Sequence, residues 1–493
     1  MTKKTDTPLP TRLSGEDLTF WWTDSPVQPT TMAMLMLLDR PPDEVRLRLA
    51  FERAVAAVPR LAERVVDAPL DLTLPHWQRD PTFDLDYHVR RHGLAGSADM
   101  EELFRELAPA YETPFDRSRP LWDARIYDHV GPQGESALFF KLHHAVADGV
   151  GGNAIFGAMT DWERDGASTD DSVPHVAKGA WPNQPWLGAQ VIDALRDRVQ
   201  LDLQRAKTVA STVVDTLQHP EKLQSALEAL RSIVEIASFD SHTPLKRFGR
   251  GRRLSGLALP FDEVRRIKKA LGGTMIDVIL TIMARAIGKW HTAHRLRGVK
   301  ELMTLVPVNL RKPEEWSEKA HVGNVATGIL VPLPIRIADP LKTYREIHKR
   351  MEAKKQDPAS AASPLLADML SVLPRQFVTW MAESTFGNVD FIVTNVPGIL
   401  ATRYLAGAEI VAAYPFAPVA KRSPVSVALY GYRDSLFIGL DSDETSMPDV
   451  ERFKVMIHDS FAELLGAVEA KPPAQARRTG RSLHRRPTAA ERG

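Results

Sequence analysis

Two adjacent histidines, an acid and a group of glycines form the part of this chain best suited to catalysis. An apolar run ends at His143 and His144, and Asp148 and Gly149 follow shortly after. Successive side chains of a strand face opposite sides, so only one of the two imidazoles can face a given cavity. An imidazole, with an unperturbed pKa of about 6.5, suits proton abstraction near neutral pH. Asp148 could pair with an arginine or orient the imidazole, the glycines permit a tight turn, and a helix is expected to begin near Asn153.

Three interpretations fit these residues. They could be a pair of core histidines beside a structural acid, which is the preferred interpretation for any single histidine. They could supply two metal ligands, but no second histidine or carboxylate motif stands at ligand spacing. They could provide a general base for acyl transfer, and the combination of histidines, acid and glycines at a strand exit favours this third interpretation.

Strands and helices must hold these residues in place, and the apolar patterns predict where they lie. Strands are predicted at residues 32–38, 124–127 and 137–143, and helices at residues 43–57 and 99–111.

The segment between the two halves of the chain has a different pattern. Residues 166–183 are polar and are typical of a loop, whereas residues 186–239 show helical periodicity, with apolar positions at Leu195, Val199 and Leu203. We expect this apolar stripe to pack on the two domains, as connectors of this kind usually do.

The length and composition suit two domains. The 493 residues, 44% of them hydrophobic, can fill two cores. We predict two domains in which mixed sheets are flanked by helices, an α/β (α+β) class. The expected boundaries are an N-terminal domain at 1–175, a helical connector at 176–245, a C-terminal domain at 246–470 and a disordered basic tail at 471–493.

Charge and cysteine content exclude several functions. Lys and Arg number 63 against 62 Asp and Glu, a formal charge of +1, which argues against a nucleic-acid binder driven by bulk charge. The chain has no cysteine, which excludes a disulfide framework, a thiolate zinc site, an iron–sulfur cluster and a cysteine nucleophile.

The two ends of the chain bear on where the protein works. Residues 1–14 have no apolar stretch typical of a signal peptide, and no run approaches the ~20 apolar residues of a spanning helix. We therefore expect a cytoplasmic protein. Residues 471–493 hold seven basic residues and one acidic residue, a net charge of +6 that can bind anionic lipid headgroups. A solvated tail with no partner is the alternative.

The histidine segment, His143-His144-xxx-Asp148-Gly149, resembles the HHxxxDG motif of the bacterial wax ester synthase/acyl-CoA:diacylglycerol acyltransferase family. Further segments match this family in order over about residues 10–468. These segments are Pro120-Leu121-Trp122, residues 271–280 around Asp277, residues 306–311, residues 323–334 and Thr394-Asn395-Val396-Pro397-Gly398.

The resemblance implies a pair of chloramphenicol-acetyltransferase-like domains with a tunnel between them. It implies that His144 is the general base, that His143 and Asp148 support the geometry, and that Gly149 forms the turn. The substrates would be a long-chain acyl-CoA and either diacylglycerol or a fatty alcohol, with no cofactor and no metal. The protein would work at the inner membrane face or on lipid inclusions.

Three further residues receive supporting roles from the resemblance. Asn395 would have a structural or tunnel-lining role, and Asp277 would cap or orient the element that begins there. Trp122 belongs to the family's PLW segment, although a tryptophan beside a leucine is more often part of a core. The family usually has Asn-Asp where this chain has Ile276-Asp277, so the helper role of that asparagine cannot be carried over.

Other functions share parts of the pattern. The HxxxxD spacing from His143 to Asp148 also occurs in glycerol-phosphate acyltransferases, but we find no downstream phosphate-binding motif. Condensation domains of peptide synthesis share HHxxxDG and the fold, yet normally stand beside carrier domains. A catalytically idle lipid-binding protein on the same fold is a third alternative.

Overall fold

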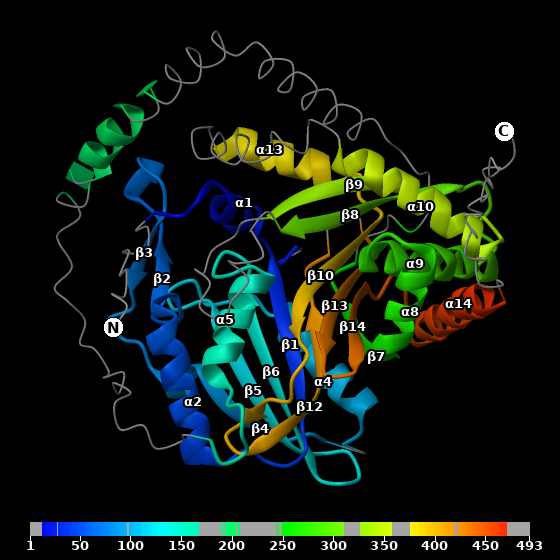
Figure 1. The fold of residues 1–493 in the computed structure, drawn as a ribbon. Coiled ribbons are helices and arrows are strands. Elements are labelled where there is room, and N and C mark those ends of the chain that lie inside the picture. Colours follow the sequence, from blue (N-terminus) through cyan, green and yellow to red (C-terminus); the bar gives the residue numbers. More distant parts are fainter. Residues whose placement is uncertain are drawn as a thin grey trace, which may run out of the picture.

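Two six-stranded sheets covered by helices form the framework of the protein (Figure 1). The computed structural model describes residues 12–166, 249–309, 326–356, 375–419 and 423–470, apart from residues 27, 96 and 97, together with short parts of residues 188–245. The predicted architecture of two mixed α/β halves is confirmed.

The first sheet has the strand order β11-β12-β1-β6-β5-β4. Its strands are β1 (Thr31–Leu38), β4 (Val89–His92), β5 (Trp122–Val130), β6 (Glu135–His143), β11 (Tyr404–Leu405) and β12 (Ala408–Phe416). A small separate sheet pairs β2 (Glu63–Val66) with β3 (His76–Arg79).

Helices cover both faces of this sheet. Residues 138, 140 and 142 of β6 pack in one cluster with α2 (Glu44–Ala57) and α5 (Gly149–Met159), and residues 137 and 139 pack in another with α4 (Met100–Glu112). A strand buried on both faces is typically apolar over consecutive residues, as β6 is at residues 137–140. Asp43 and Asp99 cap α2 and α4, each accepting a backbone N–H at 2.9 Å, so both helices lie where the sequence predicts them.

A strand from late in the chain completes the first sheet. β12 pairs antiparallel with β1, with Ala33 opposite Phe416, and β11 lies beyond it at the edge. Residues 404–416 therefore belong, by strand pairing, to the sheet of residues 31–143, whereas the sequence pattern predicts them in the C-terminal domain.

The second sheet has the order β7-β14-β13-β10-β8-β9. Its strands are β7 (Arg252–Pro260), β8 (Glu301–Asn309), β9 (Ala326–Pro334), β10 (Phe391–Ile399), β13 (Val425–Tyr432) and β14 (Ser435–Asp443). The helices of this half are α8 (Phe261–Leu271), α9 (Met275–Ala293), α10 (Pro340–Lys355), α13 (Arg375–Phe386) and α14 (Val450–Glu469). Helix α9 is the most buried of them and packs in one hydrophobic cluster with parts of α10, α14 and the sheet.

The connector differs from the expectation where the structure describes it. Leu195, Val199 and Leu203 are 47–60% exposed, and the buried positions are Ala194 and Leu201 instead. The prediction that the stripe packs on the domains is therefore wrong for these residues, because a different face of the helix packs inward. The rest of the connector and the tail at 471–493 lie outside the described residues.

No single helix within the described ranges is both long and apolar enough to cross a membrane. Among the described helices, α8 and α9 taken together reach that length and composition, but they are bent by 102° at their junction.

Candidate active site

His143 is buried and held at both ring nitrogens. The Ala145 N–H donates to its Nδ1 at 3.0 Å, so a neutral ring carries its proton on Nε2, which lies 2.9 Å from Thr30 Oγ1. Asp24 Oδ2 lies 3.7 Å from the same nitrogen. With both nitrogens engaged by the protein, His143 has no nitrogen left to take a proton from a substrate.

The carboxylate beside His143 is kept ionised. Burial alone would raise the pKa of Asp24, but hydrogen bonds from His143, the Thr30 backbone and Arg117 outweigh burial and hold this pKa well below its ordinary value. Asp24 is therefore a fixed negative charge that orients the His143 ring.

His144 points the other way. Its backbone N–H donates to Thr30 O at 2.8 Å, and its ring stacks on Phe20 of α1 (Gly15–Thr23) at 3.9 Å between centroids. The side chain is partly exposed and lines a cavity, whereas that of His143 does not. The strand ends between the two residues, and the ring that lines the cavity is that of His144.

This cavity is narrow, about 100 Å³, and almost entirely apolar. Its walls come from β1, β6 and β12 of the first sheet, from α5, and from β10 and β13 of the second sheet. Besides glycines, it is lined mainly by apolar residues, including Met32, Met34, Met36 and Met159. Methionine side chains are flexible, so such a wall can adapt to an apolar chain.

Asp148 and the glycines begin a helix. Asp148 accepts the Gly151 N–H at 2.7 Å as the N-cap of α5, so the helix begins at Gly149 and not near Asn153 as expected. Gly149, predicted to form a turn, lies in the first turn of this helix. A methyl group at Gly149 would lie 2.8 Å from Val396 Cγ2, so glycine is needed here for the close approach of β10 to α5.

Asn153 links the two halves beside the cavity, a role that the sequence pattern does not predict. Its Nδ2 donates to Pro397 O at 2.5 Å, and its Oδ1 accepts from Tyr430 at 3.2 Å. Asn153 also lines the cavity. Its place one helical turn after Gly149 is the one signal in the sequence that could have placed it near His144.

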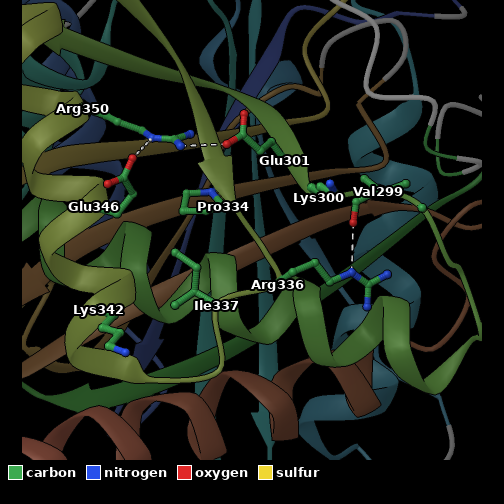
Figure 2. Close-up of a pocket in the computed structure, with 10 residues that line it drawn as sticks. Val299, Lys300, Glu301, Pro334, Arg336, Ile337, Lys342, Glu346 and Arg350 are labelled. Atoms are coloured by element: carbon green, nitrogen blue, oxygen red, sulfur yellow. Dashed lines mark hydrogen bonds and ion pairs between the residues drawn. The ribbon is translucent and has the colours of Figure 1, made fainter.

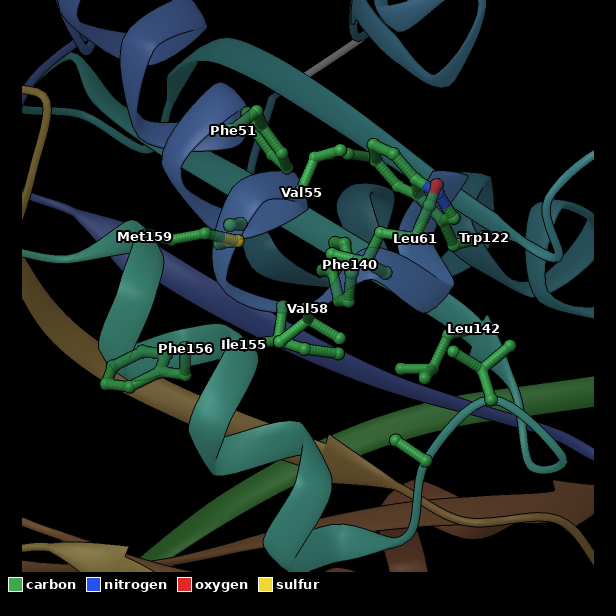
Figure 3. Close-up of a cluster of buried hydrophobic side chains, with 14 of the residues drawn as sticks. Phe51, Val55, Val58, Leu61, Trp122, Phe140, Leu142, Ile155, Phe156 and Met159 are labelled. Atoms are coloured by element: carbon green, nitrogen blue, oxygen red, sulfur yellow. The ribbon is translucent and has the colours of Figure 1, made fainter. Parts of the chain in front are cut away.

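Trp122 lies in the hydrophobic core and packs against Phe140, which lines the cavity. Its Nε1 donates to Leu61 O at 2.7 Å, and its ring stacks on His88 at 4.5 Å. Burial lowers the pKa of His88 to about 4, so this imidazole stays neutral. Figure 3 shows Trp122 with Phe140 and Leu142 in the same hydrophobic cluster as α5. Trp122 is not among the residues that line the cavity.

Neither Asp277 nor Asn395 is among the residues that line the cavity of His144. Asp277 is fully buried at the start of α9, where its Oδ2 accepts from the Thr274 N–H at 2.7 Å and lies 3.1 Å from His348 Nδ1. Asn395 is exposed, and its neighbours Thr394 and Val396 line the cavity in its place. The alternation of β10 accounts for this difference.

A larger groove of about 750 Å³ opens between α10 and the ends of β8 and β9 (Figure 2). Its arginines are already engaged: Arg350 pairs with Glu301 at 2.7 Å and with Glu346 at 2.8 Å, and Arg336 donates to Val299 O at 2.9 Å. The groove is lined by no histidine, whereas the smaller cavity is lined by His144. The described ranges contain no group of three or more His, Asp or Glu side chains that could hold a metal ion.

Two family models match the chain in succession. Residues 13–279 match the catalytic domain of wax ester synthases/diacylglycerol acyltransferases, and residues 322–465 match the C-terminal domain of the same family. The chain belongs to the wax ester synthase/diacylglycerol acyltransferase family. The resemblance seen in the sequence is thereby confirmed, and the protein is an acyltransferase.

Relatives in Mycobacterium tuberculosis carry the provisional name diacylglycerol O-acyltransferase. One from strain H37Rv is 29% identical over 449 residues, 89% of this chain and 88% of the relative. Another is 28% identical over 458 residues, 86% of this chain and 90% of the relative.

Solved structures share the fold. The wax ester synthase/diacylglycerol acyltransferase from Marinobacter aquaeolei VT8 has a TM-score of 0.62 and 20% identity, over 93% of this chain and 100% of that one. The first condensation domain of the calcium-dependent antibiotic synthetase has a TM-score of 0.59 and 15% identity, over 94% and 97%. The family and these condensation domains therefore have the same two-domain architecture.

Proposed function

We propose that this protein transfers a long-chain acyl group from acyl-CoA to the hydroxyl of diacylglycerol or of a fatty alcohol. The observation that carries the proposal is the position of His144 in a narrow apolar cavity between the two halves. An apolar cavity excludes water from the reacting groups and suits a hydrocarbon chain. The M. tuberculosis relatives named for diacylglycerol O-acyltransfer support the choice of acceptor.

His144 is the general base in this mechanism. It takes the proton from the acceptor hydroxyl as the oxygen attacks the thioester carbonyl. The tetrahedral intermediate then collapses, the carbon–sulfur bond breaks, and the CoA thiolate leaves and can take up the proton from the imidazolium. No acyl-enzyme forms, in line with a chain that has neither a cysteine nor a GxSxG nucleophile motif.

His143, Asp148 and Gly149 support this geometry indirectly. His143 ties the strand end to Thr30 and Asp24, Asp148 caps α5, and Gly149 allows β10 to approach. Trp122, Asp277 and Asn395 act at a distance, through the core, the start of α9 and β10 respectively.

The lipid substrates place the reaction at a membrane or on a lipid inclusion. We propose peripheral association on the cytoplasmic face, with the basic segment 471–493 as an auxiliary anchor to anionic headgroups.

The test offers purified full-length protein radiolabelled palmitoyl-CoA with diacylglycerol and hexadecanol in parallel reactions. We expect labelled triacylglycerol, wax ester or both, and no labelled acyl group attached to the protein by mass spectrometry. A stable acyl adduct on a serine or threonine would overturn the direct mechanism. Glycerol 3-phosphate accepted better than either lipid would overturn the proposed acceptor class.

A further inference from the structure

The cavity that His144 lines contains two other polar side chains, Asn153 and Thr394. Both ends of the Asn153 amide are engaged, with Pro397 O and with Tyr430. For the Thr394 hydroxyl, the structure gives no hydrogen-bond partner within the described part of the chain. Thr394 thus presents a hydroxyl donor to a space that is lined mainly by apolar side chains.

The register of β10 fixes the direction of this side chain. Thr394 stands opposite Ala428 of β13, and Val396 stands opposite Tyr430. Ala428 and Val396 also line the cavity, Val396 faces Gly149, and Tyr430 reaches Asn153. These residues share one face of the two strands, and Thr394 lies about 6.6 Å along β10 from Val396 on that face.

The acyl transfer proposed above needs a donor on the side of the carbonyl oxygen. When the acceptor oxygen attacks, negative charge develops on that oxygen, and a preorganised hydrogen bond to it is usually a large part of catalysis. His144 is used as the base, and Ile276, which replaces the family's asparagine, has no donor. Thr394 has one, in the same cavity and from the other half of the molecule.

We propose that Thr394 is a catalytic residue whose hydroxyl donates a hydrogen bond to the thioester oxygen and to the oxyanion of the tetrahedral intermediate. This inference rests on the proposed function. Thr394 keeps its proton throughout and forms no bond to the acyl carbon, so no acyl-threonine arises. The base then comes from the residue that follows β6 in the first half, and the oxyanion donor comes from β10 in the second, so both halves are needed for activity.

The decisive variant is Thr394→Val, which keeps the shape of the side chain and removes the hydroxyl. We expect kcat to fall on the order of 10²- to 10³-fold with KM for palmitoyl-CoA little changed, because the lost bond acts mainly in the transition state. Thr394→Ser should recover activity to within about 10-fold of wild type, because the donor returns.

Thr304→Val is the matched control. Thr304 lies on β8 in the same sheet and is buried, and the described residues offer its hydroxyl no hydrogen-bond partner, but it does not line the cavity. The kcat of the Thr304→Val variant should equal that of wild type. Valine favours strands, so both variants should fold, and circular dichroism and Tm check this. If Thr394→Val fails to fold, Thr394→Ala serves instead, compared with Thr394→Ser.

The outcomes separate this inference from the proposed function. Wild-type kcat in a folded Thr394→Val protein, alongside an inactive His144→Ala protein, overturns the role of Thr394 and leaves the acyltransfer proposal standing. A loss seen only as a higher KM also overturns it, because such a threonine would bind substrate without stabilising the transition state. Full activity in both Thr394→Val and His144→Ala overturns the base and the oxyanion donor together.

Discussion

At the scale of single residues, the two neighbouring histidines have different environments because β6 ends between them. His143 is enclosed by Ala145, Thr30 and Asp24, whereas His144 stacks on Phe20 and faces the cavity. Strand alternation predicts from the sequence that only one imidazole can face a cavity. Which imidazole faces the cavity depends on Thr30 and Asp24, which lie more than 100 residues away in the chain. No local sequence pattern predicts their contacts with His143.

Replacing His144 should therefore mainly lower activity, whereas replacing His143 should mainly lower stability. His144→Ala should lower kcat on the order of 10²-fold or more with little change in Tm, because it removes the base and only a partly exposed ring. His143→Ala should cost less activity but lower the free energy of unfolding by about 1–3 kcal/mol, because it leaves buried polar partners unsatisfied.

The change in activity is measured by the turnover of palmitoyl-CoA, and the change in stability is measured by urea denaturation. His458→Ala, at an exposed position of α14, is the control and should change neither. Near-normal turnover by a folded His144→Ala protein would contradict the assignment of the base.

At the scale of elements, the sequence predicts helices best where an aspartate begins them. Asp43 and Asp99 precede α2 and α4 as expected. The beginning of α5 was placed too late, because Gly149, Gly151 and Gly152 have poor helix propensity and are typical of a turn. The Asp148 cap and the packing of α5 against β10 override that propensity, and only the folded arrangement reveals the second of these.

Gly149 provides a test of that packing. Replacing a helical glycine by alanine usually stabilises a protein by about 0.5–1 kcal/mol. Gly149→Ala should instead destabilise it and lower turnover, because the new methyl group would lie 2.8 Å from Val396 Cγ2. Gly149→Ala combined with Val396→Ala should recover much of the lost stability.

The free energies of unfolding in urea of wild type, the two single variants and the double variant form a double-mutant cycle. Gly152→Ala is the control on the same helix, since a methyl group there comes no closer than 3.9 Å to Met32. Additive effects of the two substitutions would show that α5 and β10 are not in tight contact.

At the scale of the whole molecule, the two halves are joined by strand pairing and by side-chain contacts. β12 completes the first sheet by pairing with β1, and Asn153 on α5 binds the backbone of β10. The composition and the alternation of strands and helices predict two mixed α/β halves correctly. They cannot predict that residues 404–416 join the first sheet, because nothing in a strand's own sequence specifies a partner almost 400 residues away.

The basic tail is expected to help the whole protein bind the lipid surface that holds its substrates. Removing residues 471–493 takes away a net charge of +6 and should weaken binding to anionic liposomes at low salt. Turnover of detergent-dispersed substrate should stay unchanged, which controls for damage to the fold. Equal liposome binding by the truncated and full-length proteins would mean that the tail is only a solvated end.

The contact between the halves also contains a buried carboxyl that makes stability depend on pH. Asp441 of β14 is buried near Tyr111 and Glu112 of α4, Arg252 of β7 and Asp443. Burial raises the pKa of Asp441 to about 7, although Arg252 acts in the opposite direction. The folded protein therefore keeps a proton that the unfolded chain releases above about pH 4.

The sign of the effect follows from this difference in bound protons. Between about pH 4 and pH 7 the folded state binds the extra proton, so stability falls as pH rises, by up to about 4 kcal/mol in total. Asp441→Asn cannot titrate, so its free energy of unfolding should rise relative to wild type as pH increases from 5 to 7 and then level off. Asp434→Asn, at an exposed site in the neighbouring turn, should follow the wild-type curve. Parallel curves for Asp441→Asn and wild type over this range would show that Asp441 is ionised in the folded protein, and that the contact between α4, β7 and β14 holds an ion pair with Arg252 in place of a neutral carboxyl.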